Sequence, residues 1–307
     1  MDPNPFKKNE ERSILDKIEN QFILARKLQN VYDNRPDPKD FIGAMSGTKF
    51  EEEYTKESIK KDEEYISSTR KAIDEKNSST GLYELERKEG GFALSEMLQA
   101  MVVDMLNKGW LNEFKAEMTS DFDDLKIGAD AVLKHTTGQY LAASFDFTIT
   151  NKEKNIYNKL SLIWERNIES GNIPTIKYFK DPDTQKMGKI IAPKFIIGAS
   201  KSDVEEMASC YIENKENNLE DHKFQYMIIE QMYEQIVSAL DYFDNHNENE
   251  KLNFAKSQYE KVYTVVQRIR DKFRRENKIN NLDFYEYSKK SLALATMQNF
   301  KISKENK

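Results

Sequence analysis

Hydrophobic residues recur along this chain with two different spacings, and each spacing predicts a type of secondary structure. Apolar side chains three or four positions apart predict an amphipathic helix over residues 92–109. The same spacing predicts further helices over residues 8–32, 49–77, 152–169, 202–214, 218–246, 250–277 and 283–297. Alternating or short continuous apolar runs predict strands over Glu113–Met118, Lys126–Lys134, Gln139–Thr150, Thr175–Phe179 and Lys189–Ile197.

The order of these elements predicts the fold class and the domains. Three strands follow the helix at 92–109, another helix separates them from two more strands, and the remainder is helical. We therefore expect an α+β protein. Its expected parts are an N-terminal helical arm (1–80), a core of helices and strands (81–215) and a C-terminal helical domain (216–307).

Two acidic residues interrupt predicted strands that are otherwise apolar. Asp130 lies in the run Gly-Ala-Asp-Ala-Val-Leu, and Asp146 lies in the run Ala-Ser-Phe-Asp-Phe-Thr. An acid on the inward side of a strand is costly unless it is paired, and a divalent cation is a common partner. A third acid, Glu96, lies at the border of the apolar stripe of a predicted helix. These three carboxylates are candidate metal ligands; a purely structural role for each is the alternative.

The order of the elements and the positions of these acids resemble the PD-(D/E)xK nuclease superfamily, whose fold is restriction-endonuclease-like, over roughly residues 90–200. The core of that superfamily is a helix, three antiparallel strands, a crossover helix and a further strand. The resemblance implies that Asp130 and Asp146 hold Mg²⁺ or Mn²⁺, with the Phe147 carbonyl as a third ligand and Glu96 holding a metal-bound water or a second cation. It implies metal-dependent hydrolysis of phosphodiester bonds in nucleic acid, with DNA as the expected substrate.

Thr148 departs from the superfamily pattern, which has a lysine at this position. In active members that lysine orients the attacking water and offsets developing negative charge. The Thr148 hydroxyl can order a water but carries no charge. Lys134, which shares a strand face with Asp130, and Lys159, in the crossover helix, are the preferred replacements. Thr148 also favours an alternative function, a catalytically inactive nuclease-like domain that binds nucleic acid or protein.

Charge adds a second reason to consider that alternative. The formal net charge is −6, whereas proteins dedicated to duplex DNA are usually basic, so contact with nucleic acid must depend on a local patch. The only concentrated basic stretch, residues 260–278, predicts phosphate contacts, with a solvated helix face as the alternative. Its candidate residues are Arg268, Arg270, Lys272, Arg274 and Arg275.

The remaining composition excludes several classes of site. A single cysteine, Cys210, excludes an intramolecular disulfide and a cysteine zinc site, and the three histidines are too scattered for a histidine cluster. No apolar run is long enough to span a membrane, so we predict a cytoplasmic protein without membrane contact. The long charged helices at 49–77 and 218–277 carry stripes that favour a third alternative, a structural protein that binds a partner or a second copy of itself.

Overall fold

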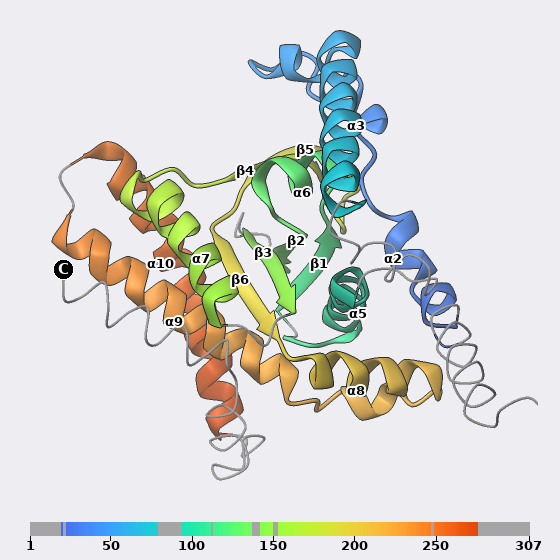
Figure 1. Cartoon of the computed structure of the whole chain (residues 1–307). Coiled ribbons are helices and arrows are strands. Elements are labelled where there is room, and N and C mark those ends of the chain that lie inside the picture. The colour runs from blue at the N-terminus through green and yellow to red at the C-terminus, as the bar shows by residue number, and fades with distance from the viewer. Residues whose placement is uncertain are drawn as a thin grey trace, which may run out of the picture.

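Helices surround a small mixed sheet in this protein (Figure 1). The computed structural model describes residue 20 and residues 23–78, 94–111, 113–136, 142–149, 153–246 and 249–275. The predicted α+β class is confirmed in this part of the chain. The helix predicted at 283–297 and most of the one predicted at 8–32 lie outside the described residues.

The elements have the following bounds. The strands are β1 Phe114–Met118, β2 Ala131–His135, β3 Ala142–Ile149, β4 Thr175–Lys180, β5 Met187–Ile191 and β6 Lys194–Ala199. The α-helices are α2 Gln29–Asp33, α3 Lys56–Ser78, α5 Leu94–Lys108, α6 Asp121–Ile127, α7 Glu153–Ile163, α8 Lys201–Ile212, α9 Phe224–Asn245 and α10 Glu250–Arg275. Short helical segments lie at Pro38–Phe41, Glu51–Tyr54, Trp164–Glu169 and Glu216–Leu219.

Among the described strands, four form one sheet in the order β1-β2-β3-β6. The first three are antiparallel neighbours, and β6 runs parallel to β3 after a connection through α7. In the register of the sheet, Ala131 lies opposite Phe145, and Ser144 lies opposite Lys194. The β4–β5 hairpin, which lies between α7 and β6 in the sequence, forms a separate two-stranded sheet.

The strand predicted over Lys126–Lys134 is wrong in its first half. α6 occupies this segment up to Ile127, because Ser120 caps its first turn by accepting a hydrogen bond from the Asp123 N–H. Gly128 ends the helix in the left-handed conformation, with a φ of 68°. The chain becomes extended only at Ala131, so Asp130 stands at the entrance to β2 instead of inside a long strand.

The strand predicted over Lys189–Ile197 is also wrong, because it comprises two strands of different sheets. β5 ends at Ile191 and β6 begins at Lys194, with Pro193 between them. Proline has no N–H to donate to a strand ladder, which favours a break at this point. The break carries the chain from the hairpin into the main sheet.

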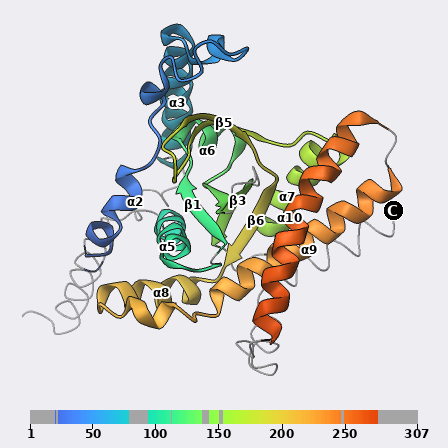
Figure 2. The same cartoon turned by 180° about the vertical axis from the view of Figure 1, so that it is seen from behind.

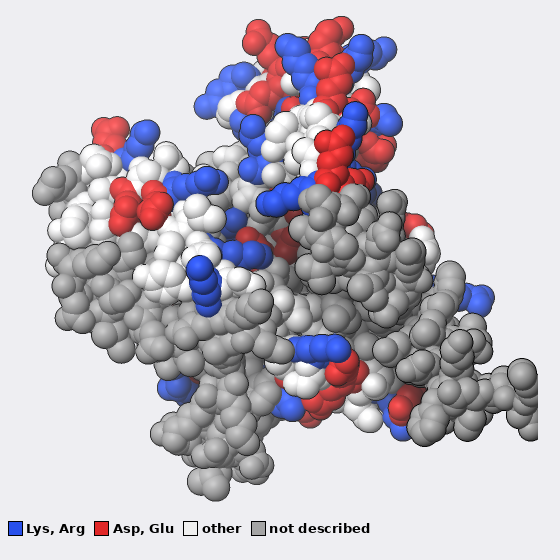
Figure 3. Space-filling model, viewed as in Figure 1, with Lys and Arg blue, Asp and Glu red and all other residues white. Residues whose placement is uncertain are grey.

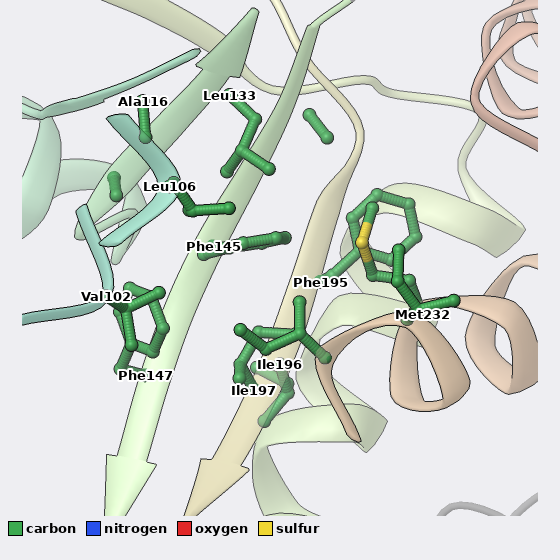
Figure 4. Packing of buried hydrophobic residues seen from close by; sticks show 14 of the residues in the cluster. Val102, Leu106, Ala116, Leu133, Phe145, Phe147, Phe195, Ile196, Ile197 and Met232 are labelled. Atoms are coloured by element: carbon green, nitrogen blue, oxygen red, sulfur yellow. The ribbon is translucent and has the colours of Figure 1, made fainter. Parts of the chain in front are cut away.

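The core lies between the sheet and the helices that cover it. Phe145 and Phe147 of β3 point toward Val102 and Leu106 of α5 (Figure 4). Phe195 of β6, the neighbouring strand, points toward Met232 of α9 (Figure 4). Phe145 and Phe195 are fully buried, and Phe147 nearly so. Alternate residues of β3 are therefore committed to this core, which leaves Asp146 and Thr148 on the opposite face.

Two glutamines of α9 occupy the outer edge of β6. Gln231 accepts a hydrogen bond from the Gly198 N–H at 2.7 Å and donates one to the Gly198 carbonyl at 3.0 Å. Gln235, one helical turn later, makes the same pair of hydrogen bonds with Ile196 at 3.0 and 2.9 Å. The side-chain amides thus reproduce the hydrogen bonds that a further strand would make.

The opposite edge of the sheet is covered in a similar way. The Asn107 amide of α5 donates to the Ala116 carbonyl of β1 at 2.8 Å and accepts from the Ala116 N–H at 3.0 Å. An unpaired edge strand is a template for association, and native proteins cover such edges. Both outer strands of the sheet are covered by amides from neighbouring helices.

The two long C-terminal helices pack against each other and cross, as both views of the chain show (Figures 1 and 2). The apolar stripe of α10 is buried within the described chain; it comprises Leu252, Tyr259, Val262, Val266, Ile269 and Phe273. The stripe that suggested an assembly surface is used here to hold α10 against the rest of the molecule. α3, by contrast, projects beyond the sheet at one end (Figure 1).

Asp123 fastens α6 to the β4 strand. It is fully buried, and its carboxylate accepts hydrogen bonds from the N–H groups of Lys177 and Tyr178 at 2.8 and 3.0 Å. Asp123→Ala leaves these donors unsatisfied and is expected to lower the free energy of unfolding by about 2–4 kcal/mol. Urea denaturation measures the change. Asp183→Ala, which removes an exposed carboxylate, is the control and should cost under about 1 kcal/mol.

Candidate metal and phosphate site

A hollow opens between α5, α6, β3 and α7. Acidic and basic side chains lie together near the centre of the face drawn in Figure 3. The lining residues are Ser95, Glu96, Gln99, Asp124, Gly128, Asp130, Asp146, Phe147, Thr148, Ile149 and Lys159. The hollow therefore brings together the predicted acids, Thr148 and one of the two predicted lysines.

Asp130 is held rigidly at the start of β2. Its N–H donates to the Phe145 carbonyl at 2.7 Å, and its carboxylate accepts from the Phe147 N–H at 2.6 Å. The side chain is almost completely buried. Burial raises the pKa of Asp130 well above its ordinary value, and the negative charges of Asp124 and Asp146 raise it further. The ionised carboxylate thus needs a compensating positive charge.

Asp146 meets two ammonium groups, one on each carboxylate oxygen. Lys159 of α7 forms an ion pair with Oδ1, and Lys194 of β6 lies 3.5 Å from Oδ2. The three side chains come from three elements, β3, α7 and β6, and β6 follows α7 only after the β4–β5 hairpin. The parallel pairing of β6 with β3 brings Lys194 to this point, since its strand position is opposite Ser144.

Lys159 contacts two of the atoms predicted to bind a metal. Its Nζ donates to Asp146 and to the Phe147 carbonyl, the latter at 3.3 Å. Oxygen atoms of this kind are the ligands of hard cations such as Mg²⁺. Lys159 thus supplies positive charge beside Asp146, although residue 148 is a threonine.

Lys194 is a member of the site that the sequence analysis missed. It donates to the carbonyls of Ile127 and Gly128 at 2.8 and 3.2 Å, as well as lying near Asp146. Burial lowers the pKa of Lys194, and the charge of Asp146 opposes that shift. Its only sequence signal is a lysine between Pro193 and the apolar run Phe195–Ile197, which resembles an ordinary strand end.

Asp124 is a second missed residue, because no element was predicted between the strands expected at Glu113–Met118 and Lys126–Lys134. It lies on α6 and lines the hollow beside Asp130. Burial raises the pKa of Asp124, whereas the guanidinium of Arg35, 3.1 Å away, lowers it. Arg35 also donates to the Thr119 carbonyl at 2.7 Å, so this cation is fixed behind the acids.

Glu96 and Thr148 occupy the wall of the hollow. Glu96 lies in the first turn of α5 with its side chain exposed at the rim. Partial desolvation by the surrounding chain nevertheless raises the pKa of Glu96, and the charge of Asp124 contributes. Thr148 is nearly buried on the same strand face as Asp146. The charge of Asp124 acts on the pKa of Glu96, whereas neither Asp130 nor Asp146 is among the charges that shift it.

Lys134 does not reach the site, and its prediction as a replacement for the missing lysine is wrong. Its ammonium forms ion pairs with Asp181 at 2.7 Å and Asp183 at 2.9 Å. Asp130 precedes β2, and four residues of extended chain separate it from Lys134 by about 13 Å. A shared strand face therefore does not bring the two side chains together.

The basic stretch on α10 is occupied by contacts within the chain. Arg270 and Arg274 meet the buried carboxylate of Glu230 at 2.7 and 3.5 Å. Arg268 pairs with Glu113, and the Arg275 Nε donates to the Asp271 carbonyl at 3.3 Å. Neither these arginines nor Lys272 lines the hollow. The predicted phosphate contacts of this stretch are therefore not part of the acidic site.

The donor set suits a cation that retains water ligands. No three His, Cys, Asp or Glu side chains among the described residues form a ready metal cage. Mg²⁺ does not require one, because it is commonly held by one or two carboxylates and keeps several waters. The Asp130 and Asp146 carboxylates and the Phe147 carbonyl, which line one hollow, are oxygen donors of that kind.

Comparisons of the chain with protein-family models, with curated proteins and with solved structures give no match. Within the part of the chain that the structure describes, no helix is both long enough and apolar enough to cross a membrane. Inference about function therefore begins with the chemistry of the hollow.

Proposed function

We propose that this protein is a divalent-metal-dependent nuclease of the PD-(D/E)xK type, which hydrolyses phosphodiester bonds in nucleic acid with DNA as the expected substrate. The observation that carries the proposal is the meeting of Asp130, Asp146 and the Lys159 ammonium in one open hollow. Two acids can hold the metal that polarises the phosphoryl group, and a neighbouring lysine can offset the negative charge that develops there.

The topology of the sheet gives independent support. A helix, three antiparallel strands, a second helix and a strand parallel to the third follow one another as α5, β1, β2, β3, α7 and β6. This is the order expected of a restriction-endonuclease-like core, with the β4–β5 hairpin inserted before the last strand. The acids lie at the start of β2 and within β3, on neighbouring strands.

Asp130, Asp146 and the Phe147 carbonyl would hold Mg²⁺ or Mn²⁺. When bound, the cation polarises a phosphoryl oxygen and lowers the pKa of a bound water. In hydrolysis the water oxygen bonds to phosphorus, the bond from phosphorus to one ester oxygen breaks, and the departing oxygen takes up a proton. The chain itself contributes the fixed orientation of Asp130, through the Phe147 N–H, and the positive charge of Lys159.

Lys159 supports catalytic competence because it supplies the charge that Thr148 lacks. Its side chain is 37% exposed, in contrast to 11% for Lys194, so it borders the solvent-filled part of the hollow. An ammonium in that position can orient a water and offset the negative charge that develops on the phosphoryl oxygens. Migration of the lysine from β3 to α7 preserves this role.

A catalytically inactive domain that binds nucleic acid or protein is the second candidate. Two observations favour it: the described residues form no three-residue metal cage, and the arginines of α10 are paired within the chain. Such a domain would retain the acids and the fold without cleaving a phosphodiester bond.

The two candidates are separated by assaying the full chain on single-stranded DNA, duplex DNA and RNA with Mg²⁺, Mn²⁺ or EDTA. The proposed nuclease cleaves at least one substrate only with metal, and Lys159→Met lowers the rate by about 10²–10³-fold. Lys134→Met is the matched control, since it removes a lysine that pairs with two acids outside the hollow. Its rate should remain that of the wild type.

Failure of the wild type to cleave any of these substrates, at protein concentrations where it binds Mn²⁺, would support the inactive candidate. Equal rates for Lys159→Met and wild type would exclude Lys159 as the replacement for the missing lysine. Cleavage that persists unchanged in EDTA would contradict metal dependence.

A further inference from the structure

We propose that Lys194 is a positioning residue of this site, which locks Asp146 to the α6–β2 turn so that Asp130 and Asp146 keep the separation needed to share one cation. The inference rests on the proposed function, which assigns the two acids to a metal. It concerns a residue on β6 that no sequence motif indicated.

The hydrogen-bonding capacity of Lys194 is fully used. An ammonium has three N–H donors, and Lys194 has three acceptors within reach. They are the carbonyls of Ile127 and Gly128 at 2.8 and 3.2 Å and Asp146 Oδ2 at 3.5 Å. Two of these acceptors belong to the end of α6 and its turn, and the third belongs to β3. One side chain thus joins the two segments that carry the acids.

Burial prevents Lys194 from acting on a substrate directly. Its side chain is 11% exposed, and it is absent from the residues that line the hollow. Lys159, on the other carboxylate oxygen, does line the hollow. The two lysines therefore have different roles. Lys159 can contact a bound phosphate, whereas Lys194 holds Asp146 and the carbonyls of Ile127 and Gly128.

Gly128 fits this arrangement closely. A Cβ at this position would lie 3.3 Å from the Lys194 Nζ and 3.6 Å from Asp146 Oδ2. The residue also has a φ of 68°, which disfavours other side chains. Glycine at this turn therefore has two effects. It adopts the positive φ that the turn needs, and its missing side chain leaves room for the Lys194 ammonium, which donates to the Ile127 and Gly128 carbonyls.

Removal of the Lys194 ammonium should change metal affinity in one direction if it positions the acids and in the opposite direction if it acts only as a positive charge. If Lys194 acts only as a nearby positive charge, its removal reduces repulsion and tightens metal binding. If it positions the acids, its removal weakens metal binding, by about 10–100-fold for partners that orient metal ligands. Lys159→Met should leave metal affinity unchanged or tighter, because it frees Asp146 and the Phe147 carbonyl.

The test is titration of the full chain with Mn²⁺, followed by electron paramagnetic resonance of the free ion, for wild type, Lys194→Met and Lys159→Met. Circular dichroism and thermal unfolding establish that each variant is folded. The expected result is a 10–100-fold higher Mn²⁺ dissociation constant for Lys194→Met and no increase for Lys159→Met.

A chemical rescue keeps the test decisive if Lys194→Met is poorly folded. In a Cys210→Ala background, Lys194→Cys is aminoethylated while unfolded and then refolded, which returns an ammonium to nearly the same position. Restored Mn²⁺ affinity in the alkylated protein supports positioning by the ammonium.

Three outcomes would overturn the proposal. Wild-type or tighter Mn²⁺ binding by folded Lys194→Met would show that Lys194 does not position the acids, while the proposed function stands. A rescued ammonium without restored affinity would have the same meaning. Absence of Mn²⁺ binding by the wild type itself would instead overturn the metal site, and the role of Lys194 with it.

Discussion

Asp146→Asn is expected to lower the rate of metal-dependent cleavage by about 10³-fold or more. Asp146 is the acid that contacts both lysines, and it lines the same hollow as Asp130, the residue before β2. Loss of its charge removes a ligand from the proposed cation, whose polarisation of the phosphoryl group is worth several kcal/mol, and about 4 kcal/mol corresponds to about 10³-fold. Initial rates at saturating Mg²⁺, on the substrate that the wild type cleaves, measure the effect.

Asp183→Asn is the matched control for this substitution. Asp183 also pairs with a lysine, Lys134 at 2.9 Å, but it lies outside the hollow and is 47% exposed. Its rate should stay within about twofold of the wild type, because exposed ion pairs contribute little. A wild-type rate for folded Asp146→Asn would remove Asp146 from the catalytic site and would leave the proposed mechanism without its central acid.

Glu230→Ala is expected to lower the free energy of unfolding by about 3–5 kcal/mol, the largest stability effect that we predict. Glu230 is buried on α9 and receives Arg270 at 2.7 Å. The Arg270 guanidinium also stacks over the Tyr233 ring, 3.7 Å from its centroid, so it cannot turn outward without losing that contact. Removal of the carboxylate leaves a buried cation without its partner. Chemical denaturation followed by circular dichroism measures the loss.

Arg274→Ala provides the comparison on the same carboxylate. Arg274 is 51% exposed and lies 3.5 Å from Glu230, so its removal should cost under about 1 kcal/mol. Similar losses for Glu230→Ala and Arg274→Ala would contradict the assignment of Arg270 as the buried partner. The result also bears on the basic stretch, because an Arg270 that stabilises the fold is not free to bind phosphate.

The strand position of Asp146 could be predicted because strand geometry is local. Side chains alternate between faces with a period of two, so the sequence around Asp146 places Phe145 and Phe147, which the structure buries in the core, on one strand face. It also placed Asp146 and Thr148 on the other face. The antiparallel succession of β2 and β3 then made the proximity of Asp130 and Asp146 a reasonable inference.

The lysines could not be ranked in the same way, because their partners are set by tertiary packing. Lys134 has the right face but the wrong distance along the strand, and it pairs with Asp181 instead. Lys194 reaches Asp146 only because β6 pairs with β3 in parallel, across a connection that includes a helix and a hairpin. The partners of the α10 arginines could not be predicted for the same reason, since Glu113 and Glu230 are distant from them in the sequence.

Short helices between strands were the other source of error. α6 has seven residues, too few for a periodic apolar pattern to distinguish it from the start of a strand. Its signals are Ser120 at the cap and Gly128 at the end, and each is common in loops as well. This error concealed Asp124, which the fold brings beside Asp130.

The amides of Gln231 and Gln235 make α9 a chemical part of the sheet. They satisfy two N–H and two carbonyl groups of Gly198 and Ile196 that no strand among the described residues pairs on that side. A truncated protein that ends before α9 would expose all four groups on a strand that also supports Lys194. The main sheet therefore depends on the C-terminal helices, because α9 keeps the outer edge of β6 from pairing with other chains.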